Sequence, residues 1–103
     1  MKPTLLLDAV TADTPSSTYA PQRGDYEGVQ SAQAPAQVHI SGVASVTLYG
    51  RTSSSMPWHP IVTLTNADVD ATTKTAAEMI TLFPQMRFVP TITSGTVSAG
   101  LGV

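Results

Sequence analysis

Five segments between residues 47 and 103 decide the fold, and they read TLYGR (47–51), PWHPIVTLT (57–65), AEMITLFP (77–84), MRFVPTIT (86–93) and GTVSAGLGV (95–103). In most of them apolar and polar residues alternate, and polar turns separate one segment from the next. Alternation with a period of two places the apolar side chains on one face of a β-strand. This part of the sequence therefore predicts short strands around a shared core.

Strands are also expected before these segments. Thr4–Val10 is a candidate with Pro3 at its start, where a missing N–H is tolerated. Val38 and Ile40 alternate with polar neighbours before Gly42, which turns the chain. About seven or eight short strands indicate an all-β fold, a small antiparallel β-sandwich of jelly-roll-like form.

The last two segments predict a hairpin in which Met86–Thr93 and Thr96–Val103 pair around Ser94-Gly95. The final strand is one-sided, because its apolar residues all fall on one face: Val97, Ala99, Leu101 and Val103. One apolar and one polar face are typical of antiparallel sheets.

Two segments are less regular. Pro57 and Pro60 beside the expected Trp58–Thr65 strand indicate an edge strand or a bulge. Ala76–Phe83 fits a helical face as well as a strand. We favour the strand because the segment is short and stops at Pro84.

The N-terminal third has a different composition, with several prolines and glycines among small polar residues between Thr11 and Pro35. We interpret the chain as one domain in which residues 1–35 supply a strand and an extended arm and residues 36–103 form the sandwich body. A short strand is expected near Tyr26–Gln30. Because such a long irregular stretch is unusual inside a compact domain, the arm should lie across the sandwich or reach a neighbouring subunit.

The amino-acid composition excludes several classes of partner and site. Charged residues make up 12% of the 103 residues, with 15 Thr and 10 Ser in their place, and the net charge is −2. Without a basic run, nucleic acid is not an expected partner. No cysteine is present, which excludes disulfides and thiolate metal sites. The sequence shows neither a signal peptide nor a membrane-spanning run, so synthesis in a cytoplasm is expected.

Residues suited to catalysis are few. His39 and His59 lack the spacing of a zinc site. Asp68 and Asp70 lack the pattern of a calcium loop, and we interpret them as a solvated turn, with a weak cation site as the alternative. No serine lies in a nucleophile elbow and no glycine-rich phosphate loop occurs. We therefore expect no enzyme activity, no cofactor and no metal.

Two side chains remain ambiguous. Trp58, the only tryptophan, fits a core anchor, which we favour, or an exposed platform for a partner or a sugar ring. Arg87 stands between Met86 and Phe88 on an apolar strand, so it needs a partner or a route to the rim. The expected partner is a carbonyl across the strand or a loop carboxylate.

The segments VHISGVASVTLYGRTSSSMPWHPIVTLT (38–65) and ITLFPQMRFVPTITSGTVSAGLGV (80–103) resemble small β-sandwich virion proteins of tailed bacteriophages. The matching positions are Gly42, Thr47, Leu48, Gly50, Arg51, Trp58, Pro84, Arg87, Gly95, Thr96, Val97 and Leu101. Tyr49, Met56 and His59 depart from the pattern around the tryptophan. The resemblance covers about two-thirds of the chain and carries over no catalytic residue.

This resemblance implies a virion structural protein, made in the host cytoplasm, that decorates or cements the capsid. Its expected partners are the major capsid protein, other virion proteins and further copies of itself, with no nucleic acid and no membrane. The alternatives are a neck, head–tail joining or tail-associated protein, and a carbohydrate-binding host-recognition module. The residues expected to contact partners are Leu5, Leu6, Leu7, Tyr19, Tyr26, Tyr49 and Trp58.

Overall fold

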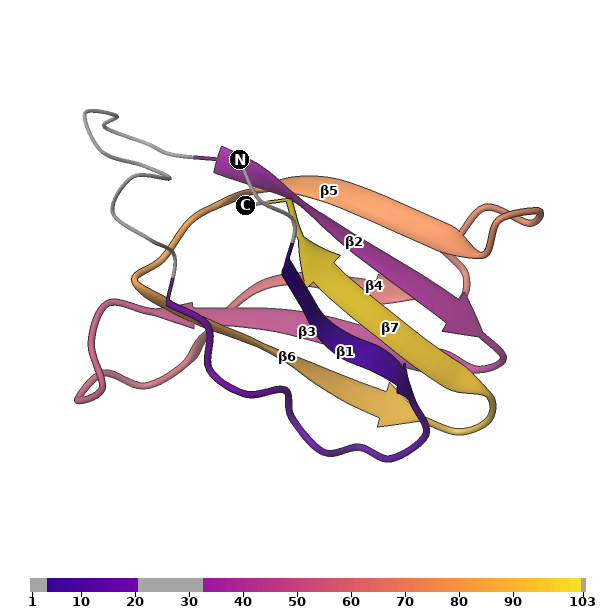
Figure 1. The fold of residues 1–103 in the computed structure, drawn as a ribbon, viewed down its shortest axis with the longest axis horizontal. Coiled ribbons are helices and arrows are strands. Elements are labelled where there is room, and N and C mark those ends of the chain that lie inside the picture. Colours follow the sequence, from indigo (N-terminus) through magenta and orange to yellow (C-terminus); the bar gives the residue numbers. More distant parts are fainter. Residues whose placement is uncertain (1–3, 21–32, 103) are drawn as a thin grey trace.

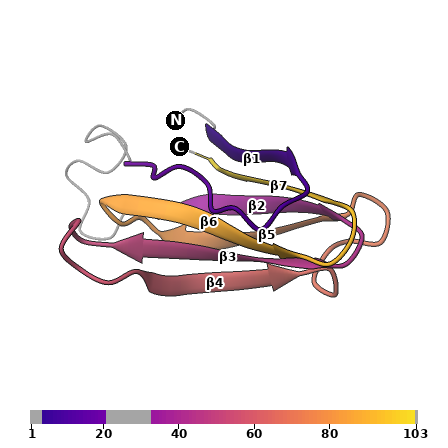
Figure 2. The same ribbon diagram turned by 90° about the horizontal axis from the view of Figure 1, so that it is seen from below.

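The computed structural model describes residues 4–20 and 33–102. This part of the chain forms seven strands: β1 (Thr4–Val10), β2 (Gln33–Ser41), β3 (Ala44–Arg51), β4 (His59–Thr65), β5 (Thr75–Thr81), β6 (Gln85–Ile92) and β7 (Thr96–Leu101). They make two antiparallel sheets, sheet A with the order β1-β7-β2-β5 and sheet B with the order β4-β3-β6 (Figure 1). Figure 2 shows the two layers edge-on, and the expected all-β sandwich is confirmed.

The core lies between the sheets and follows the alternation seen in the sequence. In β2 every second side chain is buried, and β3 and β6 follow the same rhythm. The largest fully buried side chains include Phe88, Ile40, Leu48, Met86 and Leu101. Burial of each such side chain contributes roughly 1.5–3 kcal/mol, so this apolar layer supplies most of the favourable free energy of folding.

The ambiguous segment before Pro84 is a strand, as favoured. β5 pairs with β2 along its whole length, from Thr75 opposite His39 to Thr81 opposite Gln33. Ile80 faces the core with 4% of its surface exposed. Pairing with β2 and burial of Ile80 therefore stabilise the strand more than the intrinsic helix propensity of these residues stabilises a helix.

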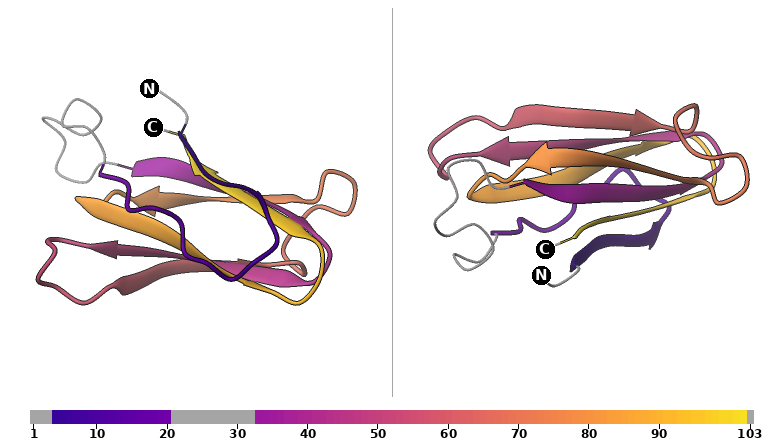
Figure 3. Two further views of the ribbon diagram at one scale, coloured as in Figure 1. Left: turned by 60° about the horizontal axis from the view of Figure 1, so that its bottom comes forward. Right: turned by 90° about the horizontal axis from the view of Figure 1, so that it is seen from above.

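The hairpin predicted for the last two strands is wrong. β6 pairs with β3 in sheet B, whereas β7 pairs with β1 and β2 in sheet A. The turn at Ser94–Gly95 carries the chain from one sheet to the other (left panel of Figure 3). Alternation identifies the buried face of each strand but not its partner. Here the two buried faces meet across the core.

β4 is an edge strand with a bulge, as the prolines indicated. Its register with β3 shifts after the pair Leu48–Val62, because the next pair is Tyr49–Pro60. Ile61 is the extra residue, and its Cδ1 lies on the core side, 2.9 Å from where a Cβ on Gly50 would stand. A bulge of this kind bends the strand and increases its twist.

The described part of the arm contacts its own sandwich, as one of the two expectations had it, but it lies along one edge and not across it. Tyr19 exchanges two backbone hydrogen bonds of 2.8 Å with Met86 on β6. The Ser16 N–H donates to the Phe88 carbonyl at 2.8 Å, and the Phe88 N–H donates to Ser16 Oγ at 2.9 Å. Asp13 Oδ1 accepts the N–H of Ile92 at 2.7 Å. The arm therefore covers the free edge of β6.

The boundary between arm and body differs from the expected division at residue 35. β1 belongs to sheet A through its pairing with β7, and β2 already begins at Gln33. The expected strand near residues 26–30 lies outside the described residues. Within the described part, the N-terminal strand is a structural member of the sandwich.

Replacing Ser16 with alanine should lower the free energy of unfolding by about 1–2 kcal/mol. Ser16 is 9% exposed, and its Oγ is the acceptor for the Phe88 N–H, which the change leaves buried and unpaired. Urea unfolding measures the loss. Ser17→Ala is the matched control, because Ser17 is exposed and its hydroxyl is not used in this contact. Equal losses for the two variants would contradict a specific role for Ser16.

Candidate functional site

Each of the four sheet edges has a feature that disfavours addition of another strand. The arm residues Ser16 and Tyr19 cover β6. β4 contains Pro60 and the bulge, and β1 has two register shifts and a positive φ of 49° at Ala9. On β5, Glu78 lines the groove between β4 and β5. Prolines, bulges and inward-facing charges are features that natural sheets use to block edge pairing, so contacts with partners are better suited to the two outer sheet faces.

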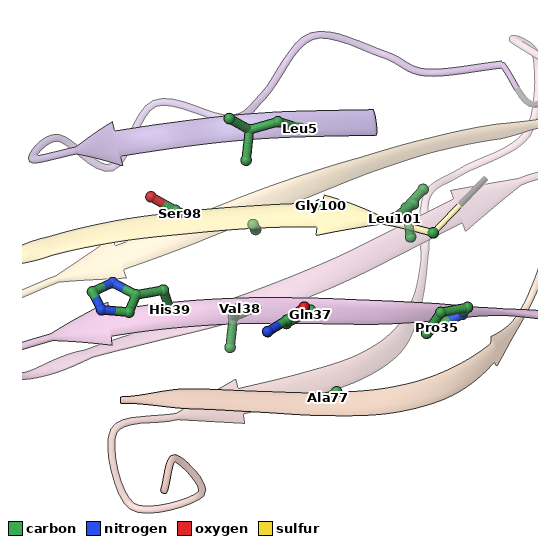
Figure 4. Close-up of a pocket in the computed structure, with 11 residues that line it drawn as sticks. Leu5, Pro35, Gln37, Val38, His39, Ala77, Ser98, Gly100 and Leu101 are labelled. Carbon is green, nitrogen blue, oxygen red and sulfur yellow. The ribbon is translucent and has the colours of Figure 1, made fainter. Parts of the chain in front are cut away.

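The outer face of sheet A is hollowed into a groove of about 340 Å³ (Figure 4). Leu5, Gly100, Gln37 and Ala77 form a row across all four strands, because each is paired with the next. Figure 4 shows Leu5 on β1 on one side of Gly100, with Gln37 and Ala77 on the other side. The lining contains no Asp, Glu, Lys or Arg, and Leu5 is 61% exposed. The small residues at the centre leave room for a protruding side chain.

The outer face of sheet B has a different character. The register places Tyr49 opposite Arg87 and Arg51 opposite Gln85, so both arginines point away from the core. The Cζ atoms of Arg51 and Arg87 lie 4.1 and 4.6 Å from the centre of the Trp58 ring. Arg51 also donates from Nε to Gln85 Oε1 at 2.7 Å. We call Arg51, Trp58, Arg87 and Gln85 the Arg–Trp cluster.

The favoured interpretation of Trp58 as a core anchor is wrong. Trp58 is half-buried and packs on the two guanidinium groups outside the core. At this end of the sandwich the core side is already occupied, because Phe83 and Ile61 pack against Gly50 and leave no space for a Cβ there. Phe83 also packs near the His59 ring, with 6.4 Å between the ring centres.

The prediction that Arg87 hydrogen-bonds to a cross-strand carbonyl or a loop carboxylate is also wrong for the described residues. Its Nε is shielded from solvent and has no acceptor there. Its guanidinium instead stacks with Trp58 through a cation–π contact, which is worth about 0.5–1 kcal/mol at exposed sites. Sequence reasoning missed Arg51 and Gln85. Their positions on the outward face of β3 and β6 were the available signal.

The residues expected to contact partners do not gather in one place. Leu5 is exposed beside the sheet A groove, whereas Leu7 is buried in the core and Leu6 packs against it. Tyr19 is half-buried at the β6 edge. Tyr49 and Trp58 share the outer face of sheet B, while Tyr26 lies outside the described residues.

The two histidines lie on different sheets, and Asp68 and Asp70 lie in the loop between β4 and β5. His39 is on β2 in sheet A and His59 is at the start of β4 in sheet B. Across residues 4–20 and 33–102, no three His, Cys, Asp or Glu side chains gather closely enough to hold a metal ion. Asp68 Oδ2 accepts the Thr65 N–H at 2.8 Å, and Asp70 caps the following turn. The expected solvated turn is confirmed.

The turn gives a prediction for pH. The backbone N–H of Thr73 and then that of Thr72 donate to Asp70 Oδ2, both at 2.9 Å, and these bonds lower the pKa of Asp70. A pKa that is lower in the folded state adds stability above the unfolded pKa, and this stability is lost as the pH falls through the folded pKa. We expect an NMR titration midpoint below the ordinary aspartate value of about 3.9. A midpoint at or above that value would contradict the capping role, and Asp70→Asn should remove this part of the acid sensitivity.

Comparison with known proteins adds no assignment, since no family model matches the chain and no curated protein or solved structure is similar enough to match. Within the described residues, no helix has the length and apolar character needed to cross a bilayer.

Proposed function

We propose that this chain is a structural protein of a tailed-phage virion that decorates the capsid and acts by binding the major capsid protein and neighbouring copies of itself. The observation that carries the proposal is the outer face of sheet A, an uncharged groove bordered by the exposed Leu5. Depletion of charge and a recessed apolar surface are typical of the centre of protein interfaces. We assign the contact with the capsid protein to this face.

Three further features support a binding role. The resemblance described above covers the strands that form most of the sandwich. The sheet edges disfavour open-ended strand addition, which allows a protein to bind through its faces without forming aggregates. Met79 on the exposed edge strand β5 is 60% exposed and extends the apolar surface next to Pro35, its partner on β2.

The test is binding of the purified chain to expanded capsids that lack it, measured by co-sedimentation, with the solution mass determined by light scattering. We expect saturable binding to the lattice and an oligomer. Gly100→Val fills the groove, and it should weaken binding at least about tenfold, or about 1.4 kcal/mol. Valine is well suited to a strand, so the fold should persist.

The control for the groove is Thr91→Val, which places the same valine side chain on the outer face of sheet B, where Thr91 is exposed. It should leave capsid binding unchanged. A monomer that ignores capsids would sink the proposal, and equal effects of the two valines would remove the groove from it.

Two alternatives from the resemblance have their own outcomes in imaging of labelled virions. A signal at one vertex or along the tail would favour a neck, head–tail joining or tail-associated protein over decoration. A carbohydrate-binding role has a specific observation in its favour, because Trp58 and Tyr49 share one outer face. It predicts binding to a glycan array that is lost in Trp58→Ala.

A further inference from the structure

We propose that the Arg–Trp cluster is a binding site for the carboxylate groups of an acidic segment on a partner protein. The inference rests on the proposed function only in taking that partner to be another virion protein. The site lies on the outer face of sheet B, separate from the groove on sheet A.

The two arginines of the cluster have unused hydrogen-bond donors. A guanidinium carries five N–H groups, and Gln85 Oε1 is the one acceptor that the described residues offer to either arginine of the cluster. Arg87 Nε is shielded from solvent without any acceptor there. Because that nitrogen is shielded, an incoming acceptor would pair with the terminal N–H groups of the two guanidiniums, which have no hydrogen-bond partner among the described residues.

The cluster also concentrates positive charge. Arg51 and Arg87 both lie within 4.6 Å of the centre of one indole ring, so two like charges are held close together. The whole chain has a net charge of −2, yet no described carboxylate hydrogen-bonds to either guanidinium. An anion at this position would offset the repulsion between the two cations.

The shape of the guanidinium groups indicates which anion fits the cluster. A carboxylate matches the planar fork of a guanidinium and accepts two parallel hydrogen bonds from it. Trp58 offers an apolar surface beside these donors, and Trp and Arg are among the residues most enriched at interface hot spots. A nucleic-acid backbone would need a longer row of cations than these two. The chemistry therefore fits Asp or Glu side chains of a protein.

The experiment is a titration of the full chain with a capped hexaglutamate peptide, followed by the fluorescence of Trp58, the only tryptophan. We expect a saturable change that weakens with added salt and is absent with the hexaglutamine peptide. Arg51→Gln and Arg87→Gln should each weaken binding at least tenfold. Arg87→Lys should restore only part of the loss, because lysine keeps the charge but lacks the fork.

Lys74→Gln is the matched control, since it removes one positive charge from the exposed loop before β5. It should bind the peptide as the wild type does. An equal loss in Lys74→Gln, or no fluorescence change at all, would overturn the proposal. Tighter binding of glucuronate or phosphate than of the peptide would also overturn it, in favour of an acidic sugar or a phosphate ligand. Circular dichroism confirms that each variant is folded.

The titration contains no capsid, so the two proposals can fail separately. Peptide binding without capsid binding would keep the site and remove the virion role. Capsid binding without peptide binding would do the reverse.

Discussion

Gly95→Ala is expected to lower the free energy of unfolding by about 4 kcal/mol or more, which is exceptional for a single substitution. Gly95 has a φ of 81°, a conformation that costs other residues roughly 1–3 kcal/mol. A Cβ there would also overlap the backbone carbonyl of Ser41, at the end of β2, where the chain passes from sheet A to β3 in sheet B. This connection and the turn at Ser94–Gly95 would both have to move. Thermal and urea unfolding of the purified variant measure the effect.

The control for this prediction is Gly100→Ala. Gly100 lies in β7 on the open outer face of sheet A, and its φ is not among the positive values of the described glycines. Alanine in a strand should be neutral or slightly stabilising there. If Gly95→Ala proves as mild as Gly100→Ala, the close approach of the two crossings is wrong.

Leu101→Asp should leave the protein unfolded or aggregated. Leu101 is 2% exposed in the core and faces inward from β7, which holds β1 and β2 together. An unpaired carboxylate in an apolar core costs several kcal/mol, while a domain of this kind has only about 5–15 kcal/mol of stability in total. Far-ultraviolet circular dichroism and size-exclusion chromatography record the outcome.

Gly100→Asp places the same charge one residue earlier on the opposite face. Because side chains alternate along a strand, this carboxylate should stand in the solvent-exposed groove and leave the fold intact. A soluble, folded Leu101→Asp protein, or an unfolded Gly100→Asp protein, would contradict the assigned faces of β7.

The existence of most strands could be predicted from the sequence. Alternation located buried positions in β2 and β7, such as Val38, Ile40, Val97 and Leu101, and prolines indicated the irregular edge at β4. Strand partners could not be predicted, because a period of two carries no information about which strand lies alongside. For this reason the last two strands were wrongly paired with each other.

The candidate site was less predictable than the fold. Arm residues such as Ser16 bind β6 largely through backbone groups, which leave no periodic signal in a sequence. Trp58 immediately precedes a bulged strand, so alternation does not determine its direction. Its contact with Arg51 and Arg87 depends on three segments meeting on one sheet face. The pairing of β3 with β6 brings the two arginines together, and the segment before β4 adds Trp58.

We propose that this chain binds a virus particle through its sheet faces, and its copy number in purified virions tests this proposal. Quantitative mass spectrometry can compare the chain with the major capsid protein in the same particles. We predict a fixed ratio between the two proteins, with a copy number of the chain that is of the same order as the number of capsid subunits in the lattice. Complete absence of the chain from purified particles would show that it is not a virion protein.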